Sequence, residues 1–252
     1  MVRFRFGGLR LADLDLDGAV AWITAQADAR RPTVVVTPNI NHLHLVETVP
    51  RVREAIAEAD VQLADGWPLV AASRVLRQRL PERIAGIDLV ERLVESPRSF
   101  SLAILGGPAD TADRLAQRAR GVNDVVLVDA LPPGWDEPVR LAQLLQRVQA
   151  ARPDLVLIGI GAPRQELLAH DLKRTVRGPI LCCGAAIEVL AGFRPRAPRF
   201  LQLLGLEWAF RLAIEPRRLL RRYLVSGTTF LRVLAREALK LRLRGGEESR
   251  RA

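Results

Sequence analysis

The sequence predicts an α/β protein with a mostly parallel sheet covered by helices on both faces, followed by a basic helical C-terminal appendage. Short apolar runs predict the sheet, because they are continuous rather than alternating, as in strands buried on both faces. Helical patterns between these runs imply right-handed crossovers that join parallel strands. The appendage is indicated by an uneven distribution of charge along the chain.

The expected elements follow in chain order. Residues 4–6 and 9–11 flank two glycines, which predicts a small hairpin. Six strands are expected next, at residues 33–37, 61–64, 101–105, 124–128, 155–158 and 179–183. Apolar residues at helical spacing predict helices over residues 109–121 and 139–151. Cys182 and Cys183 fall in the last strand, so we expect two small buried side chains rather than a disulfide or a zinc site.

Length and composition exclude several classes of protein. The 252 residues are 49% hydrophobic and 26% charged, which suits one large domain with or without a small appendage and is too apolar for a disordered chain. No uncharged apolar run reaches the roughly 18 residues of a membrane-spanning helix, and the first residues lack the apolar core of a signal peptide. We therefore expect a protein made and kept in the cytoplasm.

The net charge of +10 is concentrated near the C-terminus. Residues 194–252 contain 15 of the 38 basic side chains and 5 of the 28 acidic ones, so the rest of the chain is balanced. Such a segment suits an anionic partner, whether phosphate groups, a lipid surface or nucleic acid. We accordingly divide the chain into an α/β domain at residues 1–192, an appendage at 193–244 and a polar tail at 245–252 that is expected to be disordered.

The appendage contains an amphipathic stretch at residues 216–225. On a helical wheel its basic side chains gather on one face and its apolar side chains on the other. The basic face consists of Arg217, Arg218, Arg221 and Arg222, and the apolar face of Leu219, Leu220, Tyr223 and Leu224. A helix of this kind can lie on an anionic bilayer or cover a phosphate-bearing site. The alternative is the solvated face of an ordinary surface helix.

The residues that follow the expected strands are rich in Gly, Asp, Asn and Thr. Ligands bind at the carboxyl ends of parallel strands, so these residues suit a phosphate or sugar site. Asp65 ends an apolar strand and precedes Gly66, so its carboxylate is expected to face that edge, where partial burial would tune it as a general base. The alternative is an aspartate that caps a helix.

Three motifs suggest other chemistries but fit them poorly. Residues 159–164 begin as a dinucleotide fingerprint, but Arg164 replaces the third glycine, so they suit a turn that opens a helix toward a diphosphate better than a nicotinamide site. Residues 13–17 contain Asp-x-Asp twice, and we expect them to cap a helix near Asp17 rather than bind a metal. His42 and His44 have no nearby cysteine, so no metal site is expected.

A series of motifs covers residues 33–225, and the stretch 159–166 is the most specific of them. The segments are Thr37-Pro38-Asn39, Ala64-Asp65-Gly66, residues 83–89, Gly106-Gly107-Pro108, residues 159–166, Ala191-Gly192, Arg196-Ala197-Pro198, residues 205–208, Arg211-Leu212, Glu215-Pro216 with Arg218, and Arg222-Tyr223. In number, order and spacing they resemble the WecG/TagA/CpsF glycosyltransferases, which build bacterial surface polymers.

The resemblance implies a Rossmann-like domain with a membrane-directed appendage. It also implies an inverting, metal-independent glycosyltransferase that moves an N-acetylmannosamine-type sugar or a related hexose from a UDP-sugar to a sugar on a polyprenyl diphosphate. The UDP-sugar is then the donor substrate, and no separate cofactor is expected. The lipid-linked acceptor implies a peripheral protein on the anionic inner face of the cell membrane, and no nucleic-acid partner is expected.

The resemblance also assigns roles to residues of this sequence. Asp65 would be the general base, Thr37 and Asn39 would line the sugar site, and Gln165 would help hold the nucleotide. Four arginines would contact the diphosphate of donor or acceptor, namely Arg211, Arg218, Arg221 and Arg222. The remaining residues expected to bind substrate are Gly66, Arg83, Asp88, Gly107, Gly159, Gly161, Arg164 and Glu166. Without a metal, guanidinium groups suit the leaving diphosphate because they bind phosphate in a bidentate manner.

The sequence departs from the family pattern at three places. Glu188 stands where the family has an aspartate, so it keeps the carboxylate of a nucleotide-binding position on a longer side chain. Leu167 and Leu168 stand where a tryptophan is usual. Trp135 replaces a tyrosine and is expected to stack on uracil, with a packed loop aromatic as the alternative.

Two other classes of function remain as alternatives. The arginine-rich tail suits a nucleic-acid- or lipid-binding protein, but it has few aromatic residues for base stacking, and the residues at the strand ends would then have no use. A nicotinamide-dependent oxidoreductase is disfavoured by the broken fingerprint. Salt-sensitive RNA binding would favour the first class, and a change in nicotinamide absorbance on adding a sugar nucleotide the second.

Overall fold

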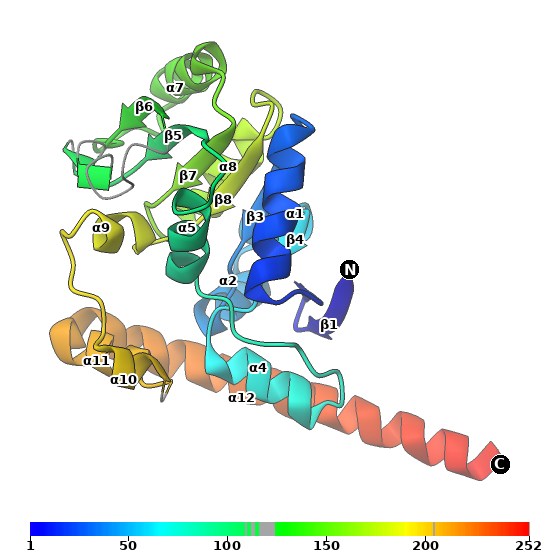
Figure 1. Ribbon diagram of the computed structural model, residues 1–252. Coiled ribbons are helices and arrows are strands. Elements are labelled where there is room, and N and C mark those ends of the chain that lie inside the picture. Colours follow the sequence, from blue (N-terminus) through cyan, green and yellow to red (C-terminus); the bar gives the residue numbers. More distant parts are fainter. Residues whose placement is uncertain (109, 112–113, 116–123, 204, 252) are drawn as a thin grey trace.

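The computed structural model describes residues 1–108, 110–111, 114–115, 124–203 and 205–251, shown in Figure 1. Within these residues one eight-stranded sheet has the order β1-β2-β4-β3-β8-β7-β5-β6. The strands are β1 (Val2–Phe6), β2 (Leu9–Ala12), β3 (Thr33–Val36), β4 (Val61–Gln62), β5 (Ser101–Leu105), β6 (Asp124–Asp129), β7 (Leu155–Ile158) and β8 (Pro179–Cys182). The fold is α/β and Rossmann-like, as the sequence predicts.

All neighbouring strands pair in parallel except β1 and β2, which form the expected antiparallel hairpin. The hairpin extends the sheet, because β2 pairs in parallel with β4 at Leu11 and Gln62. β4 is shorter than the predicted strand at residues 61–64, although the Leu63 backbone N–H still donates to the carbonyl of Val36 at 2.9 Å. The helix predicted over residues 139–151 is α7 (Pro138–Ala151), whereas most of the one predicted over 109–121 lies outside the described residues.

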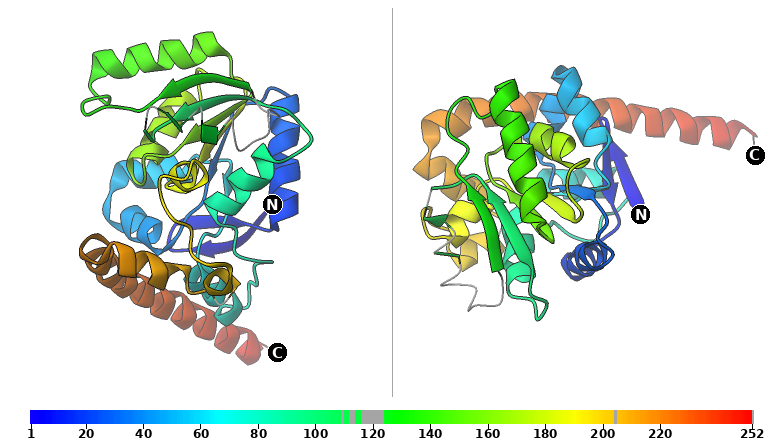
Figure 2. Two further views of the ribbon diagram at one scale, coloured as in Figure 1. Left: turned by 60° about the vertical axis from the view of Figure 1, so that its left-hand side comes forward. Right: turned by 90° about the horizontal axis from the view of Figure 1, so that it is seen from above.

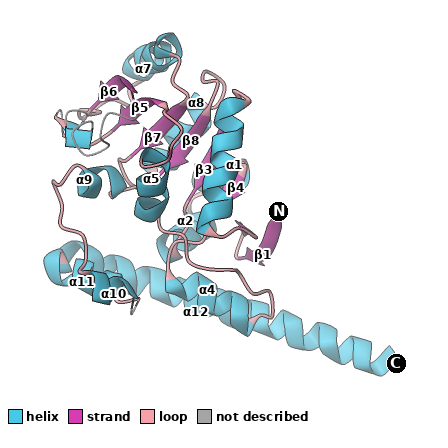
Figure 3. Cartoon of the chain, in the orientation of Figure 1, coloured by secondary structure: helices cyan, strands magenta, loops and turns pink. Residues whose placement is uncertain are grey.

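Helices cover both faces of the sheet, which explains the continuous apolar runs (Figures 2 and 3). Successive strand side chains point to opposite faces, so each β3, β7 and β8 run supplies both cores. One core joins the strands to α1 (Leu16–Asp28), α5 (Gly86–Val94) and α9 (Ala186–Leu190). The opposite core joins them to α7 and α8 (Arg164–Leu172). Cys182 and Cys183 are both buried and free, as predicted.

A third core lies around the hairpin. It contains apolar side chains from β1, β2, α2 (Ile40–Thr48), α3 (Pro50–Ala57) and α4 (Trp67–Val75). It also contains Val233, which belongs to the C-terminal segment. This segment is therefore packed on the α/β body rather than separate from it.

The C-terminal segment forms α10 (Arg199–Leu203), α11 (Glu207–Ile214) and α12 (Pro216–Arg251), in Figure 1 below the sheet. Two polar contacts join α12 to α2: His44 Nδ1 lies 2.9 Å from Thr229 Oγ1, and Arg236 lies 3.0 Å from Glu47. α12 runs past residue 245, where a separate tail is expected from the sequence, and its far end projects beyond the body (Figure 1). No helix among the described residues is both long and apolar enough to cross a membrane.

Candidate functional site

Asp65 lies just past the carboxyl end of β4, at the edge of the sheet where ligands of such folds bind. Its backbone N–H donates to the carbonyl of Pro38 at 2.8 Å, which ties the loop after β4 to the loop after β3. Gly66 follows with a φ of +120°, a conformation that side chains rarely adopt, and it begins α4 without a side-chain cap. Asp65 is therefore not the helix cap considered as an alternative, and its carboxylate remains available for chemistry.

The surroundings of the Asp65 carboxylate favour a base. The side chain is 28% exposed, so a substrate can reach it. Burial raises the pKa of this carboxyl above its ordinary value, and the charge of Glu207 raises it further. The positive charges of Arg83 and Arg211 oppose this shift, and Arg83 Nη1 lies 3.9 Å from the Asp65 carboxylate. A carboxylate with a raised pKa accepts a proton more readily than an exposed aspartate does.

Arg83 connects Asp65 to the C-terminal segment. It lies 3.3 Å from Asp88 on α5 and 3.4 Å from Glu207 on α11. Arg211 lies 2.8 Å from the other oxygen of Glu207. Three residues expected to bind substrate, Arg83, Asp88 and Arg211, are thus brought together beside Asp65. Glu207, which joins these two arginines, is not among the residues expected from the sequence to bind substrate.

A second ion-pair group supports the first. Arg196, in the segment that leads to α10, pairs with Asp88 and lies 2.7 Å from Glu91. Each of the carboxylates near Arg83 therefore contacts at least one guanidinium. This arrangement neutralises the acidic side chains around Asp65 and holds the start of the C-terminal segment against α5.

Thr37 and Asn39 lie in the loop after β3. The Thr37 hydroxyl donates to the backbone carbonyl of Cys182 at 3.2 Å, which links the ends of two neighbouring strands. Asn39 caps α2, because its side-chain oxygen accepts from the N–H of Asn41 at 3.0 Å. His42 completes this cap by accepting from the backbone N–H of Asn39 through Nδ1 at 3.2 Å. Of the side chains expected to line the sugar site, Thr37 is thus held by the end of β8 and Asn39 by the first turn of α2.

A buried hydrogen-bond chain continues from His42 across the sheet edge. With Nδ1 as an acceptor, the imidazole carries its proton on Nε2 and donates it to Glu166, 3.0 Å away. Gln165 donates to the same Glu166 oxygen at 2.7 Å and accepts from the backbone N–H of Gly184 at 3.0 Å. The chain joins the loops that follow β3, β7 and β8, three adjacent strands. Gln165 and Glu166 are expected to bind substrate, but both side chains are buried and take part in this hydrogen-bond network.

Residues 159–163 form the turn between β7 and α8, as the sequence predicts. A side chain at Gly159 would approach the backbone oxygen of Gly184 to 2.9 Å, so the strand ends pack closely there. Gly161 has a φ of +80° and faces open space, which leaves room for a ligand beside the start of α8. Gly107 follows β5 at the same edge of the sheet. Arg164 begins α8, and its guanidinium lies 5.4 Å from the centre of the Trp135 ring.

Several expected binding residues lie elsewhere or are otherwise engaged. Trp135 is only 6% exposed and packs in the core shared by α7 and α8, which favours the packed aromatic over uracil stacking. Glu188 on α9 pairs with Arg194. On α12, Arg221 is exposed, and the Arg222 guanidinium lies 5.6 Å from the centre of the Tyr223 ring. The side chain of Arg218 lies outside the described part of the structure. Among the described side chains of the four arginines expected to bind diphosphate, only Arg211 belongs to the ion-pair network around Asp65.

The motifs considered for metals have structural roles. Asp15 caps α1 by accepting from the N–H of Gly18 at 2.8 Å, as the sequence predicts. Asp17 pairs with Arg92, and Asp13 lies 3.8 Å from Arg3. Among the described residues, no group of three or more His, Cys, Asp or Glu side chains is arranged to hold a metal ion.

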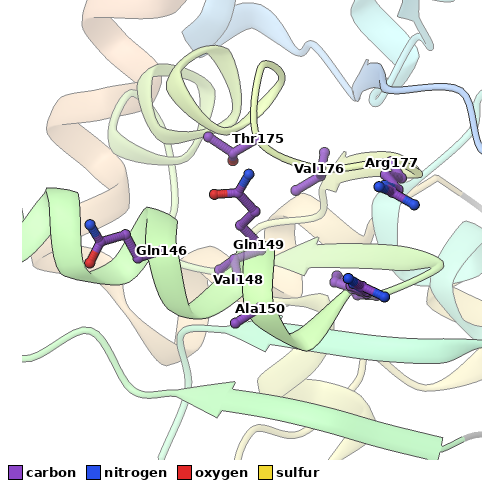
Figure 4. A pocket seen from close by; sticks show the side chains of 9 residues that line it. Gln146, Val148, Gln149, Ala150, Thr175, Val176 and Arg177 are labelled. Atoms are coloured by element: carbon purple, nitrogen blue, oxygen red, sulfur yellow. The ribbon is translucent and has the colours of Figure 1, made fainter.

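A hollow on the surface of the molecule lies away from Asp65. It has a volume of about 610 Å³ and is shown in Figure 4. Its walls are the end of α7 and the segments that enter β7 and β8, at the amino ends of these strands. Ligands of this type of fold bind at the opposite edge, so the hollow does not extend the candidate site.

His42 and Glu207 have places in the candidate site that were not predicted from the sequence. His42 stands three residues after Asn39, the spacing of a cap and its third helical residue, and that spacing was the available signal. Glu207 belongs to a matched motif, but nothing in the sequence indicates that it reaches Arg83, 124 positions earlier.

Residues 4–244 match the model of the Glycosyl transferase WecG/TagA/CpsF family, which is nearly the whole chain. The match includes the α/β body together with most of the C-terminal segment. Both parts of the Asp65 network therefore lie inside it.

Proposed function

Because the chain belongs to the WecG/TagA/CpsF glycosyltransferase family, we propose that it moves an N-acetylmannosamine-type sugar or a related hexose from a UDP-sugar to a polyprenyl-diphosphate-linked sugar. Membership makes the chain a transferase of surface polysaccharide synthesis. The donor, the acceptor, inversion at the sugar carbon and independence of metal ions belong to the proposal. The observation that carries it is the raised pKa of Asp65 at the ligand-binding edge, beside two guanidiniums.

In this mechanism Asp65 is the general base. It takes the proton of the acceptor hydroxyl as that oxygen attacks the anomeric carbon from the face opposite the UDP group. The new bond forms as the bond between the anomeric carbon and the phosphate oxygen breaks, and its electron pair leaves with UDP. Loss of a positioned base costs about 10²- to 10⁴-fold in rate, so Asp65→Asn should abolish most of the activity.

The departing UDP gains negative charge, which needs stabilisation where it develops. Arg83 and Arg211 lie beside Asp65 and suit this role, because guanidinium groups bind phosphate oxygens in a bidentate manner. The start of α8 at Arg164, with open space in front of Gly161, suits the other end of the donor. Thr37 and Asn39 would line the sugar between these two ends.

We also propose that the C-terminal segment rests on the anionic inner face of the cell membrane. Exposed apolar side chains support this placement, because they are unfavourable in water and would be buried at a membrane interface. On α10, α11 and the first half of α12 they are Phe200, Trp208, Ile214, Leu220, Leu224, Val225 and Leu231. The apolar face predicted from the helical wheel is divided, since Leu219 packs into the protein whereas Leu220 and Leu224 stay exposed.

The test of the reaction measures UDP release from a panel of UDP-sugars, with and without a short-chain prenyl-diphosphate-linked sugar, in the presence of EDTA. Acceptor-dependent release that survives EDTA and is lost in Asp65→Asn would support the proposal. Asp60→Asn is the matched control, because Asp60 precedes the same strand at its other end and pairs with Lys173. No release with any donor, from a protein that binds RNA in a salt-sensitive manner, would favour the nucleic-acid-binding alternative.

The test of the membrane placement measures sedimentation with anionic vesicles. Leu220→Glu combined with Leu224→Glu should reduce binding, because these side chains would enter the interface. Val139→Glu on α7 is the control, since Val139 is also exposed but lies on the α/β body. Equal binding by the double variant and the control would contradict the proposed orientation.

A further inference from the structure

Glu207 is an acidic side chain in the basic C-terminal segment, and it is only 9% exposed. One of its oxygens lies 3.4 Å from Arg83 Nη1, and the other lies 2.8 Å from Arg211 Nη2. The same Nη1 atom of Arg83 lies 3.9 Å from the Asp65 carboxylate. Glu207 is thus separated from Asp65 by one guanidinium and holds a second one.

We infer that Glu207 is a positioning residue, which fixes Arg83 and Arg211 beside Asp65. The inference rests on the proposed function, in which Asp65 takes a proton and the guanidiniums stabilise UDP. The contacts of Glu207 with both arginines support this role. Arg211 on α11 is one of the two arginines whose charge acts on Asp65, and Glu207, one helical turn earlier, is its partner at i,i+4.

The negative charge of Glu207 also acts on Asp65. Arg83 and Arg211 each lower the pKa of Asp65, and His42 lowers it further, whereas Glu207 raises it. Arg83 also pairs with Asp88, so Glu207 is one of two carboxylates that hold this guanidinium beside Asp65. If Glu207 lost its charge, the two guanidiniums would be less balanced and the pKa of Asp65 would fall. A base with a lower pKa removes a proton less effectively at neutral pH.

The decisive measurement is the dependence of kcat/KM on pH, in the wild type, Glu207→Gln and Glu207→Asp. Activity is lost at low pH as Asp65 becomes protonated. A lower Asp65 pKa would keep it ionised further into acid, so the acid limb in Glu207→Gln should move to lower pH. The rate at neutral pH should fall about 10- to 100-fold because the arginines are no longer held. Glu207→Asp keeps the charge, so its limb should stay close to that of the wild type while its rate falls.

The control is Glu47→Gln. Glu47 also joins the body to the C-terminal segment, through Arg236 at 3.0 Å, but it is not among the charges that act on Asp65. This variant should leave the acid limb in place. A purely structural role for Glu207 would lower the rate of Glu207→Gln without moving its acid limb, and that result would overturn the inference.

A titration that needs no turnover separates this inference from the proposed reaction. The carboxyl carbon of Asp65, labelled with ¹³C and identified by its absence in Asp65→Asn, is followed by NMR against pH. Its midpoint should be lower in Glu207→Gln than in the wild type. If the wild type transfers no sugar, the proposed function fails, and this titration still decides whether Glu207 acts on Asp65. Identical midpoints in the two proteins would refute the action of Glu207.

Discussion

Replacing His42 with alanine is expected to destabilise the folded protein by about 3–5 kcal/mol, the cost of leaving a buried carboxylate without the donor that compensates its charge. His42 Nε2 lies 3.0 Å from a Glu166 oxygen, and Glu166 is only 1% exposed. The second Glu166 oxygen already lacks a partner among the described residues. After the substitution, the remaining side-chain donor to this carboxylate among the described residues would be Gln165, at 2.7 Å.

The assay is urea unfolding of the wild type, His42→Ala, Glu166→Ala and the double variant. Removing Glu166 also removes the charge that His42 satisfies, so the double variant should cost less than the sum of the single ones. For a chain of this size, 3–5 kcal/mol corresponds to a fall in Tm of roughly 10 °C. His44→Ala serves as the control, because among the described residues the His44 imidazole has one hydrogen-bond partner, Thr229 at 2.9 Å, and its loss should cost about 1 kcal/mol.

Two results would refute this reasoning. One is a cost for His42→Ala no greater than for His44→Ala, which would mean that the Glu166 carboxylate is satisfied without the imidazole. The other is strict additivity in the double variant, which would mean that the two side chains do not interact energetically. In either case the hydrogen-bond chain could not hold the loops of the candidate site in place.

Three further predictions concern the rest of the fold. Val233→Ala should destabilise the protein by about 2 kcal/mol, because it removes two buried methyl groups from the core that holds α12, and an unchanged urea midpoint would contradict this docking. Burial raises the pKa of Cys183 to about 12 and also raises that of Cys182, so DTNB at pH 8 should label neither thiol until the protein is unfolded. The Glu47–Arg236 pair lies at the surface and is partly exposed, so Glu47→Gln should cost less than about 1 kcal/mol in the same unfolding assay.

The strands could be predicted because each is a short apolar run with both faces covered. The order of strands could not, since it depends on which helices pack together. In particular, nothing local indicates that β2 continues the sheet beside β4, because that pairing involves residues about 50 positions apart. The same holds for the C-terminal segment. Its charge distinguishes it from the preceding residues 1–192, but nothing local predicts its contacts with α2, which form only on folding.

The candidate site was predictable only in part. Asp65 and Gly66 could be found because a carboxylate and a glycine after a strand mark the carboxyl edge of the sheet. Charge and residue type alone could not tell which arginines reach this edge. Arg83 and Arg211 reach it because Glu207 lies between them, whereas Arg221, of the same residue type and in the same segment, lies exposed on α12.

Pairing with carboxylates need not prevent the arginines from binding phosphate. A guanidinium has five N–H donors in a fixed plane, so it can bind a carboxylate on one edge and a phosphate on another. In the part of the chain that the structure describes, Arg211 contacts Glu207 through Nη2 alone, which leaves the donors of Nε and Nη1 for a ligand. A free arginine would have to lose side-chain entropy to reach the same orientation. The carboxylate of Glu207 therefore orients the guanidinium of Arg211 before a phosphate binds.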